Sequence, residues 1–330
     1  MAALDTKDRK ILYELDLNSR QSFSRLAKKV GLSKDAVRYR ITSLEEQGVI
    51  QRFHTVINVS KLGFISFRIY MKFYNTDPSE EEKIIQHLRQ KKEVAWLVSI
   101  DGEYDLGMWL LVKSVQEMNV IWKEIQHKFG NYIQKRRLTI MMRIPYYTRA
   151  YLIAKKHNDE EYAFITEDEK ENIDAKSWEI LDLLAPNARI SILELSQKTR
   201  LTPKTVIAKI RDLEKRDIIV GYRTMFDIQK LGFQYFKIHA DLKNITPEKI
   251  KKLKRFIKGN PYIIYDNEIL GGDDLELDVQ VESIDQLRVW MAALKNEFSD
   301  IIRDLRYMVF YKEHKYVFMP QSYPSSSTQD

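Results

Sequence analysis

Apolar positions in the first 60 residues recur three and four places apart, and then give way to alternation. Ile11, Leu12 and Leu15 form one apolar stripe behind Asp5, which predicts a helix capped by that aspartate and ending near Leu17. Two shorter stripes follow, and each begins after a serine that can cap a helix. An alternating, β-rich stretch closes the segment. Three helices, a tight turn and a β ribbon are typical of a winged helix-turn-helix.

The second and third helices carry their own boundary signals. Ser22 precedes the second helix, and Gly31, which tolerates positive φ, ends it. Ser33 precedes the third helix, which is expected over residues 34–47. The β-rich stretch 49–59 is expected to be a wing or a connecting strand.

The following segment alternates between β-rich runs and amphipathic helices in the order β-α-β-β-α-β. This order predicts a ferredoxin-like sandwich, in which two helices cover one face of an antiparallel sheet. The other face must also be covered, and a second sheet of the same kind is expected to cover it. The predicted strands are 65–74, 94–100, 106–112 and 133–144, and the predicted helices are 79–90 and 115–129.

The whole pattern recurs at a constant offset of 169 residues. Residues 4–64 align without a gap with 173–233, and 21 of these 61 pairs are identical. The register persists beyond this block, where Gly102 falls on Gly271. A repeat of this length indicates a duplicated domain pair, and fusion of two unlike halves predicts an intramolecular pseudo-dimer. The predicted strands of the second copy are 234–242, 262–269, 275–281 and 302–311, and its predicted helices are 247–258 and 284–298.

The expected fold is therefore α+β, with two repeats that each place a winged helix-turn-helix before a ferredoxin-like βαββαβ sensor domain. The bridge between the repeats is dense in acidic residues, which predicts a solvated linker that only Tyr162, Phe164 and Ile165 would tack down. The predicted divisions are winged helix-turn-helix 1 (1–60), sensor domain 1 (61–154), a charged linker (155–172), winged helix-turn-helix 2 (173–229), sensor domain 2 (230–320) and a disordered tail (321–330).

Composition narrows the classes of protein. The absence of cysteine excludes disulfides and thiolate zinc sites and fits a reducing cytoplasm. No run of some 18 apolar residues and no signal-peptide pattern occur, so a cytoplasmic protein without a membrane partner is expected. The net charge of +7 permits a polyanionic partner. The six histidines lack ligand spacing, and no nucleophile signature or phosphate loop accompanies them, so neither catalysis, a cofactor nor a metal is expected.

Several motifs resemble those of the Lrp/AsnC family of transcription regulators. They are residues 4–12, Asn18-Ser19-Arg20, residues 22–33, Arg40 with residues 44–50, and the turn Gly102-Glu103-Tyr104-Asp105-Leu106. The resemblance covers nearly the whole chain twice, and the second copy is more diverged. It implies a transcription regulator that binds double-stranded DNA through its helix-turn-helix and dimerises through its ferredoxin-like sensor. It also implies an amino-acid effector near the glycine turn, and further self-association of whole chains stays open.

The outward-facing residues of the third helix are the candidates for DNA contact, because a recognition helix meets base edges and phosphates in the major groove. Ile207 stands in copy two where copy one has Arg38, so we expect unlike helices and an asymmetric site with half-sites about one helical turn apart. Basic residues on an exposed helix also occur as a solvated face, but the accompanying helix-turn-helix pattern favours DNA. The predicted contacts are Lys34, Arg38, Tyr39 and Thr42 in copy one and Lys204, Lys209 and Arg211 in copy two.

The glycine turns are the candidate ligand site. Gly102 and Gly271 precede strands, where positive φ would bring backbone amides near a ligand carboxylate, and Tyr104 belongs to the same turn. Asp105 or Asp274 would hold an ammonium group. The alternative is a tight β-turn in which glycine and aspartate serve the turn itself. Acidic residues also crowd copy two, where they either bind a cation or face water; they are Asp266, Glu268, Asp273, Asp274, Glu276 and Asp278.

Two other functions stay open. Fused sirohaem decarboxylases also resemble this family and come as paired halves, and they would need a basic, histidine-bearing pocket for the tetrapyrrole carboxylates. His54 and Arg223 occupy equivalent positions in the two copies, but no cluster of such residues is evident around them in the sequence. The other alternative is a scaffold whose winged helices bind protein instead of DNA.

Overall fold

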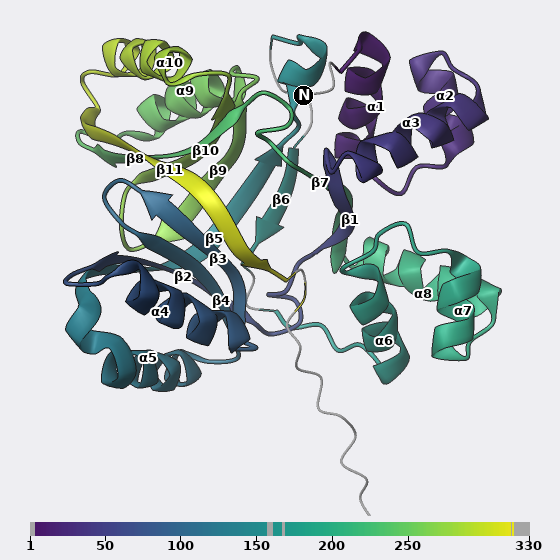
Figure 1. Ribbon diagram of the computed structural model, residues 1–330, viewed down its shortest axis with the longest axis horizontal. Coiled ribbons are helices and arrows are strands. Elements are labelled where there is room, and N and C mark those ends of the chain that lie inside the picture. The colour runs from purple at the N-terminus through teal and green to yellow at the C-terminus, as the bar shows by residue number, and fades with distance from the viewer. Residues whose placement is uncertain (1–3, 157–160, 167–168, 318, 320–330) are drawn as a thin grey trace, which may run out of the picture.

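Two three-helix domains lie beside one β-barrel in the computed structural model, which describes residues 4–156, 161–166, 169–317 and 319 (Figure 1). The helices match the expected ones in both copies, and the predicted tail 321–330 lies outside the described residues. No helix in the described part of the chain is long and apolar enough to cross a bilayer. The helices are α1 (Thr6–Leu17), α2 (Phe23–Val30) and α3 (Lys34–Glu46) in copy one, and α6 (Ala175–Leu184), α7 (Ile192–Thr199) and α8 (Pro203–Lys215) in copy two.

Side-chain caps begin these helices as the sequence predicts. Asp5 accepts a hydrogen bond from the backbone N–H of Asp8, and Ser33 accepts one from that of Ala36. Gly31 ends α2 in the left-handed region with φ of 66°. Arg200 takes the same place after α7 with φ of 56°, so copy two keeps the turn geometry without the glycine that favours it.

The β ribbon forms between the two copies and not within either of them. Strand β1 (Ile50–Ile57) pairs antiparallel with β7 (Ile219–Phe226), and in this register His54 lies opposite Arg223. These two residues are equivalent in the repeat, so the approximate two-fold axis that relates the copies passes between them. The stretch expected to be a wing or a connecting strand is therefore a connecting strand that holds the two helical domains together.

The sensor strands close into one barrel. The sheet order is β2-β4-β3-β11-β8-β10-β9-β5-β6, and β5 also pairs back to β2. Each sensor sheet thus covers the open face of the other, as expected, and a closed barrel removes exposed strand edges. The strands are β2 (Ile65–Phe73), β3 (Val94–Asp101), β4 (Leu106–Val112) and β5 (Ile133–Tyr147) in copy one, and β8 (Gln234–Leu242), β9 (Ile263–Leu270), β10 (Leu275–Val281) and β11 (Ile302–Tyr316) in copy two.

Two strands are longer than the sequence predicts, and their extra residues join the copies. Strand β5 was expected to end at Ile144 but continues to Tyr147, and β11 continues to Tyr316 and not Tyr311. The first part of each pairs within its own sensor, and the second part pairs with the other sensor, β5 with β9 and β11 with β3. The β-sheet hydrogen bonds of each sensor are complete only when both copies are present.

The helices of the sensors cover the outside of the barrel. Two separate apolar cores lie beneath them, one for each sensor. The barrel interior differs from these cores because it contains buried charged side chains, among them Lys237 and Glu276, both fully buried. The helices are α4 (Pro78–Gln90), α5 (Val115–Phe129), α9 (Pro247–Lys258) and α10 (Ile284–Glu297), with short 3-10 turns at Gly130–Tyr132 and Ala150–Ile153.

The bridge between the repeats, predicted to be a solvated linker, contains a strand in its described part. Its residues Glu161–Ile165 form strand β6, which pairs antiparallel with Arg143–Tyr147 of β5. The strand, which the sequence did not predict, includes Tyr162, Phe164 and Ile165, and it forms because the end of β5 presents unpaired backbone groups that an adjacent extended segment can satisfy.

The two helical domains also exchange matching contacts. Arg20 donates to the backbone carbonyls of Ala188 and Ile190 in the other copy. Its repeat equivalent, Arg189, donates to the carbonyls of Ser19 and Gln21. Both arginines are half-buried in this contact, and the matching pair holds the two helical domains together.

We expect Arg20→Met to weaken this contact, because the carbonyls of the opposite domain would lose a charged donor. Hydrogen bonds to charged groups contribute about 1.5–3 kcal/mol, so unfolding free energy should fall by about that amount. Urea unfolding followed by circular dichroism measures the change, with Arg25→Met on the exposed face of α2 as the control. Equal stability of the two variants would contradict the structural role of Arg20.

Candidate functional site

The outer arc of α3 is exposed as the helical spacing predicts. Lys34, Arg38, Tyr39 and Thr42 all lie on the surface, and the Tyr39 side chain is 75% exposed. The guanidinium of Arg38 lies 5.5 Å from the centre of the Phe23 ring on α2, which holds it over the junction of the two helices. These side chains form one polar outer face on α3 that no other part of the described chain covers.

The corresponding face of α8 is different. Lys204 and Arg211 are exposed, and Ile207 is 37% exposed where copy one has Arg38. Lys209 was expected on the outer face, but it is half-buried and its ammonium lies 2.6 Å from the carboxylate of Asp174. Its repeat equivalent Arg40 pairs with Asp5 in the same way, so this position ties the third helix to the first.

A buried ion pair connects the first helical domain to the barrel. The carboxylate of Asp16 at the end of α1 is fully buried and accepts hydrogen bonds from the Tyr146 hydroxyl at 2.7 Å and the Arg149 guanidinium at 2.5 Å. Arg223 on β7 donates to the same carboxylate at 3.3 Å. Copy two has Ala185 at the position of Asp16, so this connection exists on one side only.

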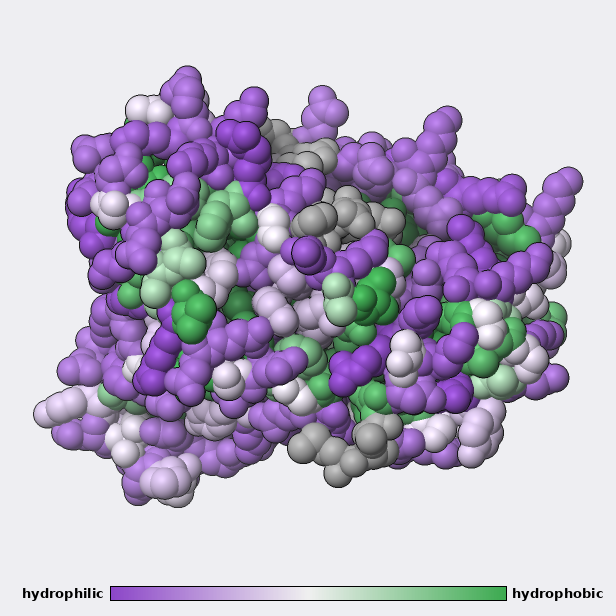
Figure 2. Space-filling model, turned by 90° about the horizontal axis from the view of Figure 1, so that it is seen from above, coloured by the Kyte–Doolittle hydropathy of each residue, from purple (hydrophilic) through white to green (hydrophobic). Residues whose placement is uncertain are grey.

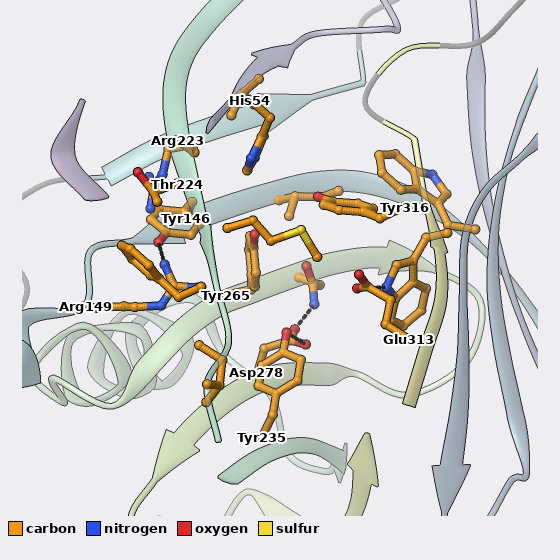
Figure 3. A pocket seen from close by; sticks show the side chains of 18 of the residues that line it. His54, Tyr146, Arg149, Arg223, Thr224, Tyr235, Tyr265, Asp278, Glu313 and Tyr316 are labelled. Atoms are coloured by element: carbon orange, nitrogen blue, oxygen red, sulfur yellow. Dashed lines mark hydrogen bonds between the residues drawn. The ribbon is translucent and has the colours of Figure 1, made fainter. Parts of the chain in front are cut away.

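A cavity of about 280 Å³ lies between the β1–β7 ribbon and the mouth of the barrel (Figure 3). His54 and Arg223 come from the ribbon, and Arg149 lies beside Tyr146 at one side. The sequence shows no basic cluster around His54 and Arg223. In the folded protein, Arg68 and Arg149 line the same cavity. The walls are largely aromatic or apolar and include Trp96, Trp109, Ile144, Met225, Phe226, Tyr265 and Tyr316.

Burial controls the charges at this cavity. It lowers the pKa of His54 well below the usual value, and the positive charges of Arg223 and Arg149 lower it further, so the imidazole is neutral near pH 7. Burial also lowers the pKa of Arg223 to about 10, against the opposing charge of Asp16. Glu313 is exposed at the edge of the same space and accepts a hydrogen bond from the Trp96 indole at 3.0 Å, and partial desolvation by the surrounding protein raises the pKa of its carboxyl.

The floor of the cavity is a hydrogen-bonded network around Asp278. Its carboxylate accepts from the Tyr235 hydroxyl at 2.8 Å, the Lys237 ammonium at 2.8 Å and the Asn267 side-chain amide at 2.6 Å. Burial acts to raise the pKa of the neighbouring Glu276, but the charges of Lys237, His239 and Arg68 hold it at about 2. The carbonyl oxygen of the Asn267 side chain is buried and accepts no hydrogen bond within the described residues.

The glycine turns lie where the two sensors pack together. Gly102 has φ of 139°, and a Cβ there would meet Met308 of the other copy at 3.2 Å. Asp105 accepts from the backbone of Phe73, and Asp274 accepts from that of Leu242 at 2.7 Å. These contacts are those of a structural turn, and a ligand role for Gly102, Tyr104, Asp105, Gly271 and Asp274 stays a prediction. Tyr104 itself is fully buried and stacks on Tyr70 inside the barrel.

The acidic residues of copy two mostly form ion pairs. His239, Asp273 and Glu276 bring potential ligand atoms within 4.8 Å of one another, which is the one such group among the described residues. Arg137 and Arg306 pair with Asp273, and Lys237 and Arg68 pair with Glu276. A cation would therefore meet carboxylates that are already neutralised, together with four nearby positive charges; Asp266 similarly pairs with Lys254, and Glu268 with Arg143.

Comparison with known proteins identifies the helical domains and their relatives. The pattern of winged helix-turn-helix DNA-binding domains matches residues 4–51 and 173–220. The HTH-type transcriptional regulator Ptr1 of Methanocaldococcus jannaschii is 31% identical over 140 residues, which span 42% of this chain and 93% of that protein. A solved AsnC family transcriptional regulator from Agrobacterium tumefaciens is 24% identical over 42% of this chain and 90% of its own, with a TM-score of 0.38.

One solved structure has the architecture of the whole chain. The siroheme decarboxylase NirDL covers 96% of this chain and 94% of its own, with a TM-score of 0.63 and 14% sequence identity. It has also been solved with an iron-uroporphyrin III analogue. At this identity the likeness establishes the shared fold of the two repeats.

The charge state of Glu313 predicts a pH effect on stability. The raised pKa means that the folded protein holds this proton more tightly than the unfolded chain, so the contribution favours folding at low pH and is lost as pH rises from about 4.5 to about 7. Because Glu313 is exposed, solvent screens the effect and its size is small. We expect Glu313→Gln to gain stability relative to the wild type across that range and to keep the gain above it. Thermal unfolding in buffers from pH 4 to 8 measures this, with exposed Glu282→Gln as the control, and parallel profiles for the wild type and Glu313→Gln would refute it.

Proposed function

We propose that this chain, which belongs to the Lrp/AsnC-like family of helix-turn-helix transcriptional regulators and is duplicated in tandem, binds DNA. In this proposal the two copies act as an intramolecular pseudo-dimer on one DNA duplex. The observation that carries this proposal is that the contacts between the two helical domains are equivalent, whereas the outer faces of α3 and α8 differ. Arg20 and Arg189 make equivalent contacts across the axis, whereas Arg38 and Ile207 differ on the outer faces. A fixed frame therefore presents two unlike helices to DNA.

The difference between α3 and α8 supports recognition of an asymmetric sequence. The arc of α3 offers a guanidinium, an ammonium, a phenol and a hydroxyl, which can donate to base edges and phosphates in the major groove. The arc of α8 offers Lys204 and Arg211 around an apolar centre, a composition suited to phosphates and thymine methyl groups. Figure 2 shows that the face seen from above is mostly hydrophilic, with its apolar residues in small groups.

Ligand control is the second part of the proposal. The strands that follow α3 and α8 pair directly with each other, so a small ligand at the sensor interface would act on the spacing of the two recognition helices. An amino acid or similar compound near the Gly102 and Gly271 turns is the form of control expected from the sequence. The inter-sensor position of these turns supports it, since Gly102 packs on Met308 and Gly272 packs on Thr139.

Exchange of the unlike residues tests DNA reading. We expect Arg38→Ile to lose about 1–3 kcal/mol of specific binding free energy, because a base-reading guanidinium is removed. Ile207→Arg should instead raise affinity for a symmetric site built from the half-site of α3. Fragments selected from random genomic DNA supply the sites, and gel shifts at several salt concentrations measure the affinities.

The control is Arg288→Gln, which removes an exposed arginine from α10 on the sensor. Phosphate contacts should give a steep loss of affinity with salt in the wild type. A weak salt dependence, or no selected sequence, would favour a protein-binding scaffold over a DNA regulator. If Arg38→Ile and Ile207→Arg both keep the DNA-sequence preference of the wild type, the outer faces of α3 and α8 do not recognise bases.

A decarboxylase acting on sirohaem is the second candidate, favoured by the cavity with His54 and its arginines and by the whole-chain likeness to NirDL. The volume of about 280 Å³ lies just below the usual range of roughly 300–1,000 Å³ for ligand pockets, which is small for a macrocycle. We therefore expect no shift in the visible absorbance of sirohaem on mixing with the protein. A saturable shift that is lost in His54→Leu, but kept in Arg288→Gln, would overturn this ranking in favour of the enzyme.

A further inference from the structure

We propose that the cavity under the β1–β7 ribbon binds a small planar carboxylate carrying a hydrogen-bond donor at its far end, and that this ligand controls DNA binding. That the ligand controls DNA binding rests on the proposed function; we call this the regulatory half of the inference. That the cavity binds such a ligand, the binding half, does not rest on it. The site is separate from the glycine turns, and His54, Arg223, Asn267 and the aromatic walls build it.

The ribbon end of the cavity is suited to an anion. Arg149 and Arg223 line this end and share the carboxylate of Asp16, whereas Arg68, the third arginine of the lining, pairs with Glu276 beside the floor network. A carboxylate placed against Arg223 would add a counter-charge where burial disfavours the guanidinium, and the neutral imidazole of His54 beside it can donate a further hydrogen bond.

The opposite end is suited to a donor. Asn267 is 3% exposed, and its amide nitrogen donates to the Asp278 carboxylate at 2.6 Å. This bond fixes the orientation of the amide, because only the nitrogen can donate to a carboxylate. The side-chain oxygen of Asn267 is thereby left as a buried acceptor without a donor in the described residues, a position that is unfavourable unless a ligand or water group meets it.

The middle of the cavity is suited to a flat ring. Tyr265 and Tyr316 stand between the two polar ends (Figure 3), and Trp96 and Trp109 also line the cavity. Aromatic walls favour planar ligands through stacking and edge-to-face contacts, and the volume of about 280 Å³ admits a small molecule. The complementary ligand thus has a carboxylate, a planar body and a hydroxyl or amino group remote from the carboxylate.

The roof of the cavity connects this ligand to DNA binding. Strand β1 begins four residues after the end of α3, and β7 begins four residues after the end of α8. A ligand that contacts His54 and Arg223 therefore touches the central pair of the ribbon that spaces the recognition helices. Binding that favours one ribbon geometry shifts the population of helix spacings by its differential affinity for them.

Isothermal titration calorimetry on the full chain without DNA tests the binding half. The probe is 4-hydroxybenzoate, compared with benzoate, which lacks the donor, and 4-hydroxybenzyl alcohol, which lacks the charge. We expect saturable binding of 4-hydroxybenzoate, a loss of roughly two- to tenfold for benzoate and no measurable binding of the alcohol. Arg223→Gln should weaken the probe roughly tenfold or more, and Asn267→Leu should bind 4-hydroxybenzoate and benzoate equally.

Arg288→Gln is the matched control for charge, and circular dichroism checks that each variant folds. Equal binding of the acid and the alcohol, or no binding of any carboxylate at millimolar concentration, would overturn the inference. If Arg223→Gln does not fold, the comparison of the three probes on the wild type decides the matter. Gel shifts with and without 4-hydroxybenzoate test whether the ligand controls DNA binding. If saturating 4-hydroxybenzoate leaves the affinity for DNA unchanged, the regulatory part of the inference is wrong, although DNA binding itself would remain supported.

Discussion

Backbone hydrogen bonding between the two copies is the interaction on which the rest of the structure depends. Strand β1 has no partner in its own helical domain, and the second halves of β5 and β11 have none in their own sensors. An unpaired strand edge leaves polar backbone groups that must find partners or meet water. The two copies satisfy each other's edges at three places, and this fixes the positions of the ribbon, the barrel and the helices α3 and α8.

Fusion of the copies allows this symmetric frame to carry asymmetric chemistry. Residues on the axis of a homodimer would be identical, but here His54 faces Arg223 in the ribbon and Tyr70 meets His239 inside the barrel. The inner face of copy two contributes Lys237, Glu276 and Asp278, whereas the equivalent positions of copy one hold Arg68, Gly107 and Trp109. The barrel interior therefore pairs an acidic network from one copy with aromatic and cationic groups from the other.

Much of the local structure could be predicted from the sequence, because its signals act over a few residues. Serine and aspartate caps, apolar stripes and alternating strands correctly indicated the helices, the order of the sensor elements and the exposed arc of Lys34, Arg38, Tyr39 and Thr42. The errors concern contacts between distant segments. The sequence predicts Lys209 as an outward-facing cation, but in the structure its ammonium pairs with Asp174, which lies 35 residues earlier in the chain. No local signal marks Arg149 as part of a cavity, because its partners Asp16 and Gln280 come from other domains.

The sequence by itself determined the duplication, the type of each domain and the difference between the outer faces of α3 and α8, since these follow from periodicity, capping and direct comparison of the copies. The tertiary structure alone decided how the copies meet: a shared ribbon and not a wing, one barrel and not two sheets, and a strand within the charged bridge. It also decided which residues line the cavity beneath the ribbon. Strand edges are satisfied by whichever partner the whole fold brings close, and that choice depends on contacts far apart in the chain.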